Sequence, residues 1–171
     1  LITLPLRYSR IMWGNDNTAL VFERWINDRK ERVYHINPAT TTKKTLFDRN
    51  YEDGYNDPGN IVMTQNEFGR SVMLINKDNS VYLSGSGSSP AGDMPFLDKF
   101  EINSGKKTRL WQCQAPHYEY FSSFLDVRKG TFITSRESNT ENPNYFQRTI
   151  GSTKITAITS FPHPYPQIKD V

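Results

Sequence analysis

The residues best suited to metal binding or nucleophilic catalysis are few in this chain. It has three histidines, His35, His117 and His163, and one cysteine, Cys113. The histidines do not have the mutual spacing of zinc ligands, and the cysteine completes no such pattern with them. A single cysteine excludes an internal disulfide, so a packed thiol is expected. We therefore predict no metal site, no cofactor and no catalytic residue here.

Two loops resemble active-site motifs without completing them. Gly85–Pro90 has the glycines of a phosphate loop but lacks its lysine and a following helix, and its serines are out of register for a nucleophile elbow. We interpret it as a flexible loop at the end of a strand. A Ser/His/Asp triad stays open, because its members come from distant loops. No serine, however, has a local signature of a nucleophile.

Asp48–Gly54 has oxygen ligands at alternate positions, as a calcium loop does. The sixth position of that loop should be glycine and is Asp53, and the twelfth should be glutamate and is Gly59. An acidic surface loop is therefore the better interpretation. A non-standard calcium site stays open as the alternative.

Polar residues recur where strands are expected to end. They are Glu23 and Arg24, then Gly85–Gly87, then Arg136 and Glu137. When similar sheets are arranged radially, as in a β-propeller, equivalent positions of the sheets lie on one rim of the disc. Such a rim is usually only solvated surface, but it is also where substrate or another domain would bind. We predict that Glu23, Arg24, Arg136 and Glu137 face one of these.

Three similar sets of short strands carry these residues. Apolar and polar residues largely alternate within them, and Asn, Pro and Gly supply turns between them. The sets are 19–25, 33–37 and 43–47; then 81–85, 96–103 and 106–111; then 131–135, 144–148 and 154–159. This pattern predicts an all-β fold, a partial β-propeller of about three blades with four antiparallel strands each. Since closed propellers have about four to eight blades, we expect a larger whole.

The boundaries follow from the same pattern. We expect residues 1–160 to form propeller blades and the proline-rich residues 161–171 to form a stiff connector to another domain. The repeat spacing exceeds that of compact propellers, and we assign the excess mainly to an insertion at 48–60. Little helix is expected, and 119–125 is interpreted as a turn.

Charge and hydropathy exclude several partners. The formal net charge is +3, and the basic residues are dispersed, so we predict no nucleic-acid binding. No apolar stretch is long enough for a transmembrane helix, and no signal or transit peptide is visible. We therefore predict no membrane association.

At this point the sequence resembles a known family. Several motifs are similar to the propeller of glutamyl endopeptidase-like serine peptidases of the prolyl oligopeptidase family, which occur in plant plastids and bacteria. They are 10–16, 46–49 with 55–59, 95–98, 134–138 with 140–142, and the Phe-Pro-His-Pro-Tyr-Pro segment at 161–166. The resemblance runs through nearly the whole chain.

This resemblance implies a role without catalysis. In that family a propeller precedes an α/β-hydrolase domain that carries Ser, Asp and His, and it limits entry to peptides. The resemblance thus implies that residues 1–160 are the C-terminal blades of the propeller and that 161–171 is the connector to an α/β-hydrolase domain missing from this chain. The implied partners are thus that domain of the same polypeptide and peptide substrates, and the implied compartments are plastid, bacterial periplasm or cytoplasm. No catalytic position of the family has a counterpart here. The alternative is a free-standing propeller that binds protein or glycan.

An open arc of blades has unpaired strand edges, near 3–7 and 153–159 in this chain, and such edges pair with other chains. Pro5 would weaken the first edge. We therefore predict that the isolated chain self-associates, most simply as a twofold dimer, because of its excision from a longer protein. Light scattering at increasing concentration measures this. A monomer at high concentration would contradict it, as would a full-length protein that uses the same interface.

Overall fold

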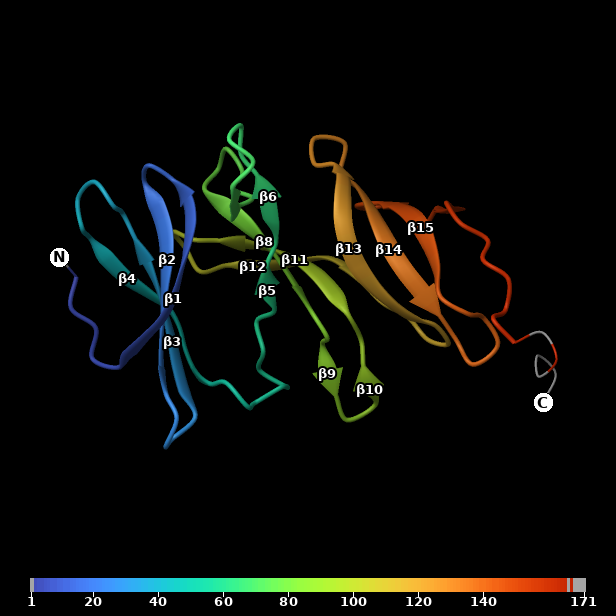
Figure 1. Ribbon diagram of the computed structural model, residues 1–171, viewed down its shortest axis with the longest axis horizontal. Coiled ribbons are helices and arrows are strands. Elements are labelled where there is room, and N and C mark those ends of the chain that lie inside the picture. Colours follow the sequence, from blue (N-terminus) through green and yellow to red (C-terminus); the bar gives the residue numbers. More distant parts are fainter. Residues whose placement is uncertain (1, 166, 168–171) are drawn as a thin grey trace. The chain divides into compact units, whose positions relative to one another are not determined.

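The computed structural model describes residues 2–165 and 167. Residues 2–165 contain sixteen β-strands and no α-helix (Figure 1). The strands are β1 Arg7–Asn15, β2 Thr18–Trp25, β3 Lys30–Ile36, β4 Lys43–Asn50, β5 Asn60–Ile61, β6 Met63–Gln65, β7 Ser71–Met73, β8 Ser80–Gly85, β9 Ser88–Ser89, β10 Gly92–Asp93, β11 Phe96–Glu101, β12 Lys107–Gln112, β13 Tyr118–Asp126, β14 Thr131–Glu137, β15 Asn144–Thr149 and β16 Ile155–Ala157.

Three sheets have four strands each, in the orders β1-β2-β3-β4, β12-β11-β8-β5 and β13-β14-β15-β16. The strand pairs of the first and third sheets are antiparallel. Four antiparallel strands in consecutive order are the unit of a propeller blade. The predicted all-β fold, with about three such blades, is confirmed.

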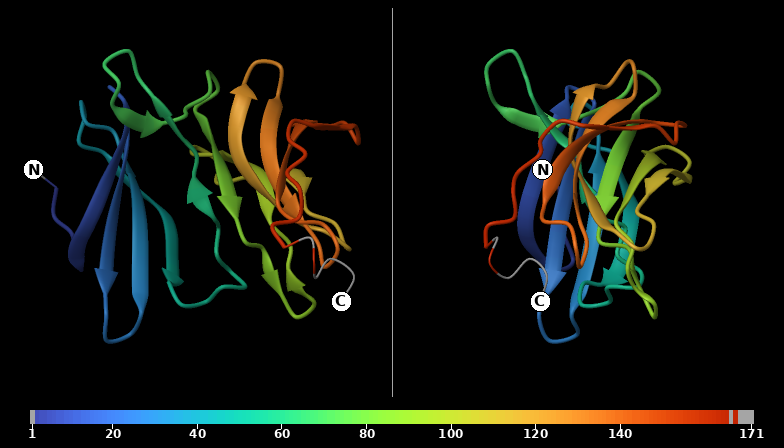
Figure 2. Two further views of the ribbon diagram at one scale, coloured as in Figure 1. Left: turned by 45° about the vertical axis from the view of Figure 1, so that its right-hand side comes forward. Right: turned by 90° about the vertical axis from the view of Figure 1, so that its right-hand side faces the viewer.

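Three local expectations differ from the structure. Residues 119–125 belong to strand β13, because Glu119 and Phe121 alternate into the core with exposed neighbours. Part of the excess length is the β6–β7 hairpin rather than the 48–60 insertion, and Figure 2 shows this green hairpin projecting past neighbouring strands. Gly85–Pro90 contributes β9 to a second hairpin with β10. The short, polar hairpin strands give little hydrophobic alternation from which to predict them.

Gly87 explains the glycine-rich sequence of that hairpin. Its φ is +63°, and an added Cβ would collide with the carbonyl oxygen of Met94. Its own carbonyl accepts a hydrogen bond from the Met94 N–H at 3.1 Å. Glycine is thus required for backbone approach between the two strands, not for binding phosphate.

The chain divides into two compact units, one of residues 1–83 with 99–108 and the other of residues 84–98 with 109–171. In unit 1 both faces of the β1–β4 sheet are covered. Leu20, Phe22, Val33 and Met73 form the core on one face. Val21, Tyr34 and Ile36 pack with Ile2, Leu4 and Ile11 on the other. Burial on both faces explains why Thr18–Glu23 is buried without alternation.

Unit 2 is held by aromatic packing. Phe132 is fully buried in β14, and its ring lies 5.8 Å from that of Trp111 and 5.9 Å from that of Phe121. Phe124 adds an edge-on contact to Phe121 at 5.2 Å. Tilted and edge-on rings at these distances stabilise a core beyond the area that they bury.

The proline-rich connector predicted for residues 161–171 is described only to Tyr165 and at Gln167. In the described part, Phe161–Tyr165 is outside the strands, and the Phe161 N–H donates to the Asn144 side chain at 2.7 Å. The rest of the predicted connector, Pro166 and 168–171, lies outside the described residues. The domain boundary at residue 160 stays a prediction.

Buried carboxylates recur in the sheets, each held by an arginine. Glu119 is 2% exposed and accepts hydrogen bonds from Arg148 Nε at 2.9 Å and Nη2 at 2.6 Å. Asp98 is 1% exposed and pairs with Arg109. A bidentate guanidinium can satisfy a carboxylate that burial has removed from water.

We predict that Arg148→Met lowers the free energy of unfolding by about 3–5 kcal/mol, because it leaves the Glu119 carboxylate buried without its cation. Urea unfolding followed by fluorescence measures the loss. The matched control is Arg128→Met in the exposed β13–β14 turn, for which a change within about 0.5 kcal/mol is expected. Equal effects of the two substitutions would contradict the assigned role of the pair.

Candidate functional site

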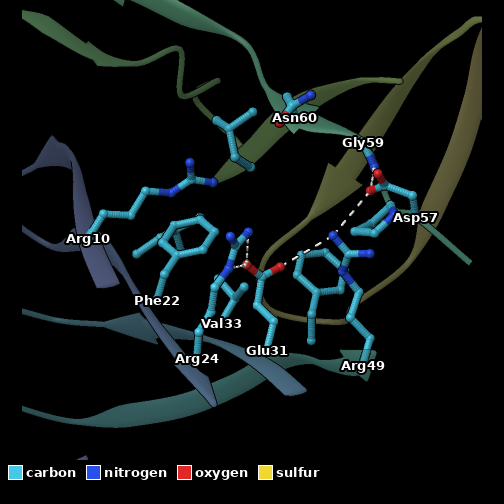
Figure 3. A pocket seen from close by; sticks show the side chains of 13 residues that line it. Arg10, Phe22, Arg24, Glu31, Val33, Arg49, Asp57, Gly59 and Asn60 are labelled. Atoms are coloured by element: carbon cyan, nitrogen blue, oxygen red, sulfur yellow. Dashed lines mark hydrogen bonds and ion pairs between the residues drawn. The ribbon is translucent and has the colours of Figure 1, made fainter. Parts of the chain in front are cut away.

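A small cavity in unit 1 gathers more charged side chains than any other concave surface described for that unit, and it is drawn in Figure 3. It has a volume of about 110 Å³. We call it the arginine pocket. Its lining residues are Arg10, Leu20, Phe22, Arg24, Glu31, Val33, Phe47, Arg49, Asp57, Pro58, Gly59, Asn60 and Ile61.

Strand register places these residues together. Side chains two positions apart share a face of a strand, so Phe22 and Arg24, Glu31 and Val33, and Phe47 and Arg49 each point to the same side. The pairings Phe22↔Val33 and Val33↔Phe47 make an apolar row across the sheet. The pairings Arg24↔Glu31 and Glu31↔Arg49 make a charged row beside it.

Glu31 is the centre of the charged row. Its side chain is 4% exposed. Its Oε2 accepts hydrogen bonds from Arg24 Nε and Nη2 at 2.6 Å each, and its Oε1 lies 3.3 Å from Arg49 Nη2 (Figure 3). Arg49 Nη2 also lies 3.5 Å from Oδ1 of Asp57, which accepts the Gly59 N–H at 2.9 Å. Asp57 thus ties the 57–60 segment to the sheet.

Arg10 enters the pocket from β1, next to a register shift between Tyr8 and Arg10. Its guanidinium lies over the Phe22 ring, 4.2 Å from the centroid (Figure 3). An arginine over an aromatic face is stabilised by the ring quadrupole and keeps its N–H groups available at the edge. None of the carboxylates in residues 2–165 makes an ion pair with Arg10.

Arg49 carries unused donors as well. Its Nε and Nη1 are buried and have no hydrogen-bond partner within the described chain. Buried unpaired donors are uncommon in folded proteins and call for an explanation. Within the described residues, the pocket therefore combines an exposed arginine without a counter-ion, Arg10, and a partly buried arginine, Arg49, of which two nitrogens lack acceptors. Planar guanidinium donors at one cavity are suited to binding an anion, not to transferring protons.

The four predicted rim residues have different environments. Arg24 is in the arginine pocket. Glu23 is fully buried on the opposite face of the same sheet, where its Oε1 accepts from Tyr34 Oη at 2.8 Å and its Oε2 from the Leu6 N–H at 2.9 Å. Its carboxylate is thus occupied by contacts within unit 1.

Arg136 and Glu137 are in unit 2, at the end of β14. Arg136 Nη2 is 3.0 Å from Oε2 of Glu141, and its guanidinium lies 4.2 Å from the centroid of the Phe146 ring. Both residues are partly exposed. That these four residues face substrate or another domain stays a prediction.

The sequence patterns missed Arg10, Glu31, Arg49 and Asp57. One signal was present: Arg24 and Glu31 flank a short turn, so in a hairpin they become direct cross-strand partners of opposite charge. The pairing of Glu31 with Arg49 on β4 then places Arg49 in the same row. Nothing local identifies Arg10, because its register depends on the shift in β1.

The other sequence candidates have structural roles. In the Asp48–Gly54 segment, Asp48 pairs with Arg32 at 2.8 Å, and Asp53 accepts N–H bonds from Tyr55 and Asn56. In the part of the chain that the structure describes, no three His, Cys, Asp or Glu side chains are arranged to hold a metal ion. Cys113 is buried, as predicted, and burial raises the pKa of its thiol.

His35 lies in a second, polar concavity of unit 1. Asparagines and Thr18 line it with His35; they are Asn15, Asn17, Asn37, Asn76, Asn79 and Asn103. The His35 Nε2 is buried without a hydrogen-bond partner within the described chain. Burial lowers the pKa of His35, and the nearby Lys44 lowers it further. Asparagine amides here also join separate turns, since the Asn79 Nδ2 donates to the Asn103 Oδ1 at 3.1 Å.

Comparison with known proteins shows relatives of this chain. It is 39% identical over 183 residues to the probable chloroplastic glutamyl endopeptidase of Arabidopsis thaliana and 37% identical over 180 residues to that of Oryza sativa subsp. japonica. Each alignment covers 96% of this chain but only 19% of the relative. The predicted resemblance to glutamyl endopeptidase-like proteins is therefore confirmed.

No family model matches the chain. Among solved structures, TolB from Acinetobacter baumannii is similar with a TM-score of 0.46 and 12% identity, over 90% of this chain and 32% of TolB. In the described residues, no helix is long and apolar enough to cross a membrane.

We predict that protonation of His35 destabilises unit 1. Its pKa is near 6.5 when unfolded and lower when folded. Below about pH 6.5 the unfolded state therefore binds the extra proton, and the free energy of unfolding falls as pH decreases towards the folded-state pKa. His35→Leu should flatten this dependence when urea unfolding is measured at a series of pH values from neutral to below about 6.5, the unfolded-state pKa. An unchanged pH profile in the variant would contradict it.

Proposed function

We propose, on the premise of this sequence relation to glutamyl endopeptidases, that the chain forms part of the non-catalytic β-propeller of a serine peptidase of the prolyl oligopeptidase family. In this proposal the propeller restricts the access of peptides to an α/β-hydrolase domain of the same polypeptide. The observation that carries the proposal is the alignment over 96% of the chain with two proteins named as glutamyl endopeptidases.

The structure supports a binding role for this portion. Four-stranded sheets of propeller-blade type supply a rigid scaffold, and charged side chains at strand ends supply polar contacts. The chain spans about a fifth of the length of these relatives, 19%. The activity of the whole protein is therefore assigned by proposal, with the catalytic residues in another part of the polypeptide.

The test uses the full-length protein and a serine-directed fluorophosphonate probe. We expect covalent labelling at a serine outside these 171 residues and cleavage of short peptides and unfolded polypeptides, with folded proteins resistant. Labelling of a serine within this chain, or cleavage of folded proteins as fast as of unfolded ones, would contradict the proposal.

The proposed restriction of peptide access to the hydrolase domain is tested at Arg136, at the end of β14. We predict that Arg136→Glu changes the ratio of kcat/KM for a long unfolded polypeptide to that for a short peptide by roughly 2- to 5-fold, the size of one partly exposed charge contact. The matched control is Arg128→Glu, in the exposed turn at the other end of the same hairpin. If both variants keep the wild-type ratio, Arg136 has no part in access.

A further inference from the structure

We propose that the polar concavity around His35 in unit 1 binds a neutral saccharide. We call it the asparagine concavity, because six of the residues that line it are asparagines. It is separate from the arginine pocket, which lies by the β2–β3 turn at the other end of the β1–β4 sheet. The inference goes beyond the proposed peptidase role and does not depend on it.

Four connections between strands bring the amides together. The β1–β2 and β3–β4 turns lie at one end of their sheet, because alternate turns of an antiparallel sheet share an end (Figure 1). The β7–β8 and β11–β12 connections meet them there. In chain order, the four connections supply Asn15 with Asn17, Asn37, Asn76 with Asn79, and Asn103. Asparagine is common in turns, so the fold gathers these amides without any need for a local motif.

The first argument is the ring nitrogen of His35 that lacks a partner. Its Nε2 is buried and has no hydrogen-bond partner within the described chain. The ring hydrogen-bonds the Asn17 backbone, whose N–H already donates to Asn15 Oδ1 at 3.0 Å. The ring therefore donates from Nδ1 to the Asn17 carbonyl, which leaves Nε2 of the neutral imidazole as an acceptor. A ligand hydroxyl would satisfy it.

The second argument is the charge of the lining. Among the described residues that line the concavity, none is acidic, and Lys77 is the only one with a full charge. Burial lowers the pKa of His35 and thus favours its neutral form. An anion would face the lone pair of Nε2, which repels it. The lining therefore suits a neutral ligand with many hydrogen-bonding groups.

The third argument is the match between amides and hydroxyls. An asparagine side chain offers a donor and an acceptor side by side, and each sugar hydroxyl both donates and accepts. Two neighbouring hydroxyls can therefore bind one amide at both of its ends. Asn17 is exposed, and within the described residues no hydrogen bond occupies its side-chain amide. That amide is thus available to a ligand.

The fourth argument is size. The concavity has a volume of about 560 Å³, within the roughly 300–1,000 Å³ of ligand pockets, so it has room for more than one sugar ring. Ile75 supplies an apolar side chain to the lining for the C–H groups of a ring. A peptide segment would also need contacts for its own side chains, and few apolar or charged groups are present here. A saccharide therefore fits better than a peptide main chain.

Saturation-transfer NMR with the full-length protein tests the proposal. The ligands are cellotriose, maltotriose and chitotriose, which are neutral and differ in linkage and in one substituent. We expect at least one of them to bind with a Kd of about 1 mM or lower. Absence of binding by all three at about 20 mM would overturn the proposal.

Two substitutions locate the site. Asn17→Ala removes an exposed amide that no strand pairing uses, and it should weaken binding by about 2- to 10-fold, the size of one neutral hydrogen bond. His35→Leu removes the acceptor and should weaken binding by a similar factor. The matched control is Asn27→Ala, in the exposed β2–β3 turn at the other end of the same sheet, which should keep the wild-type Kd. Equal Kd values for the Asn17 and Asn27 variants would overturn the assigned site.

Two other ligands test the chemical class. Lys77→Gln should leave saccharide binding unchanged, because the ligand is neutral. Inorganic phosphate that binds more tightly than every saccharide, and is lost in Lys77→Gln, would overturn the assignment in favour of an anion. A blocked trialanine that binds more tightly than the saccharides and is weakened by Asn17→Ala would overturn it in favour of a peptide main chain. Peptide cleavage is not used in any of these measurements, so the proposed function can fail independently.

Discussion

The ion pair between a buried carboxylate and an arginine on another strand of the same sheet is the interaction on which these sheets depend. Glu31 pairs with Arg24 and Arg49 on the two strands that flank it, and Glu119 with Arg148 two strands away. A carboxylate buried without such a partner costs several kcal/mol, about 3–5. The pairs therefore fix register, because a slip of one residue would move each charge to the other face.

The same constraint produces the candidate site. One arginine is enough to neutralise a buried carboxylate, but Glu31 has an arginine on each of the two neighbouring strands. Arg10, which is paired with Phe22, adds a third positive charge to the same cavity. What stabilises the sheet thus also leaves unused guanidinium donors at one cavity.

Residue type alone did not distinguish the side chains that hold the fold together from those that line the candidate site. Glu23 and Arg24 are adjacent, and both were expected at a binding rim. Their side chains point to opposite faces, so Arg24 lines the pocket while Glu23 binds Tyr34 and the Leu6 backbone. The glycines of 85–90 permit a close hairpin, and the acids of 48–54 bind arginine and backbone groups.

By itself the sequence determined the all-β class, most strands and the relation to glutamyl endopeptidases, because alternation and turn residues are local signals and long motifs identify relatives. The strand at 119–125 and the β6–β7 hairpin were missed, since their local patterns are weak. Only the tertiary structure decided which charges meet. Phe22 and Val33 are joined by a predictable hairpin, but Arg10, Arg49 and Asp57 come to the same cavity through sheet order, a register shift in β1 and a long loop. Those depend on the free energy of the whole packed unit, which no short window of sequence contains.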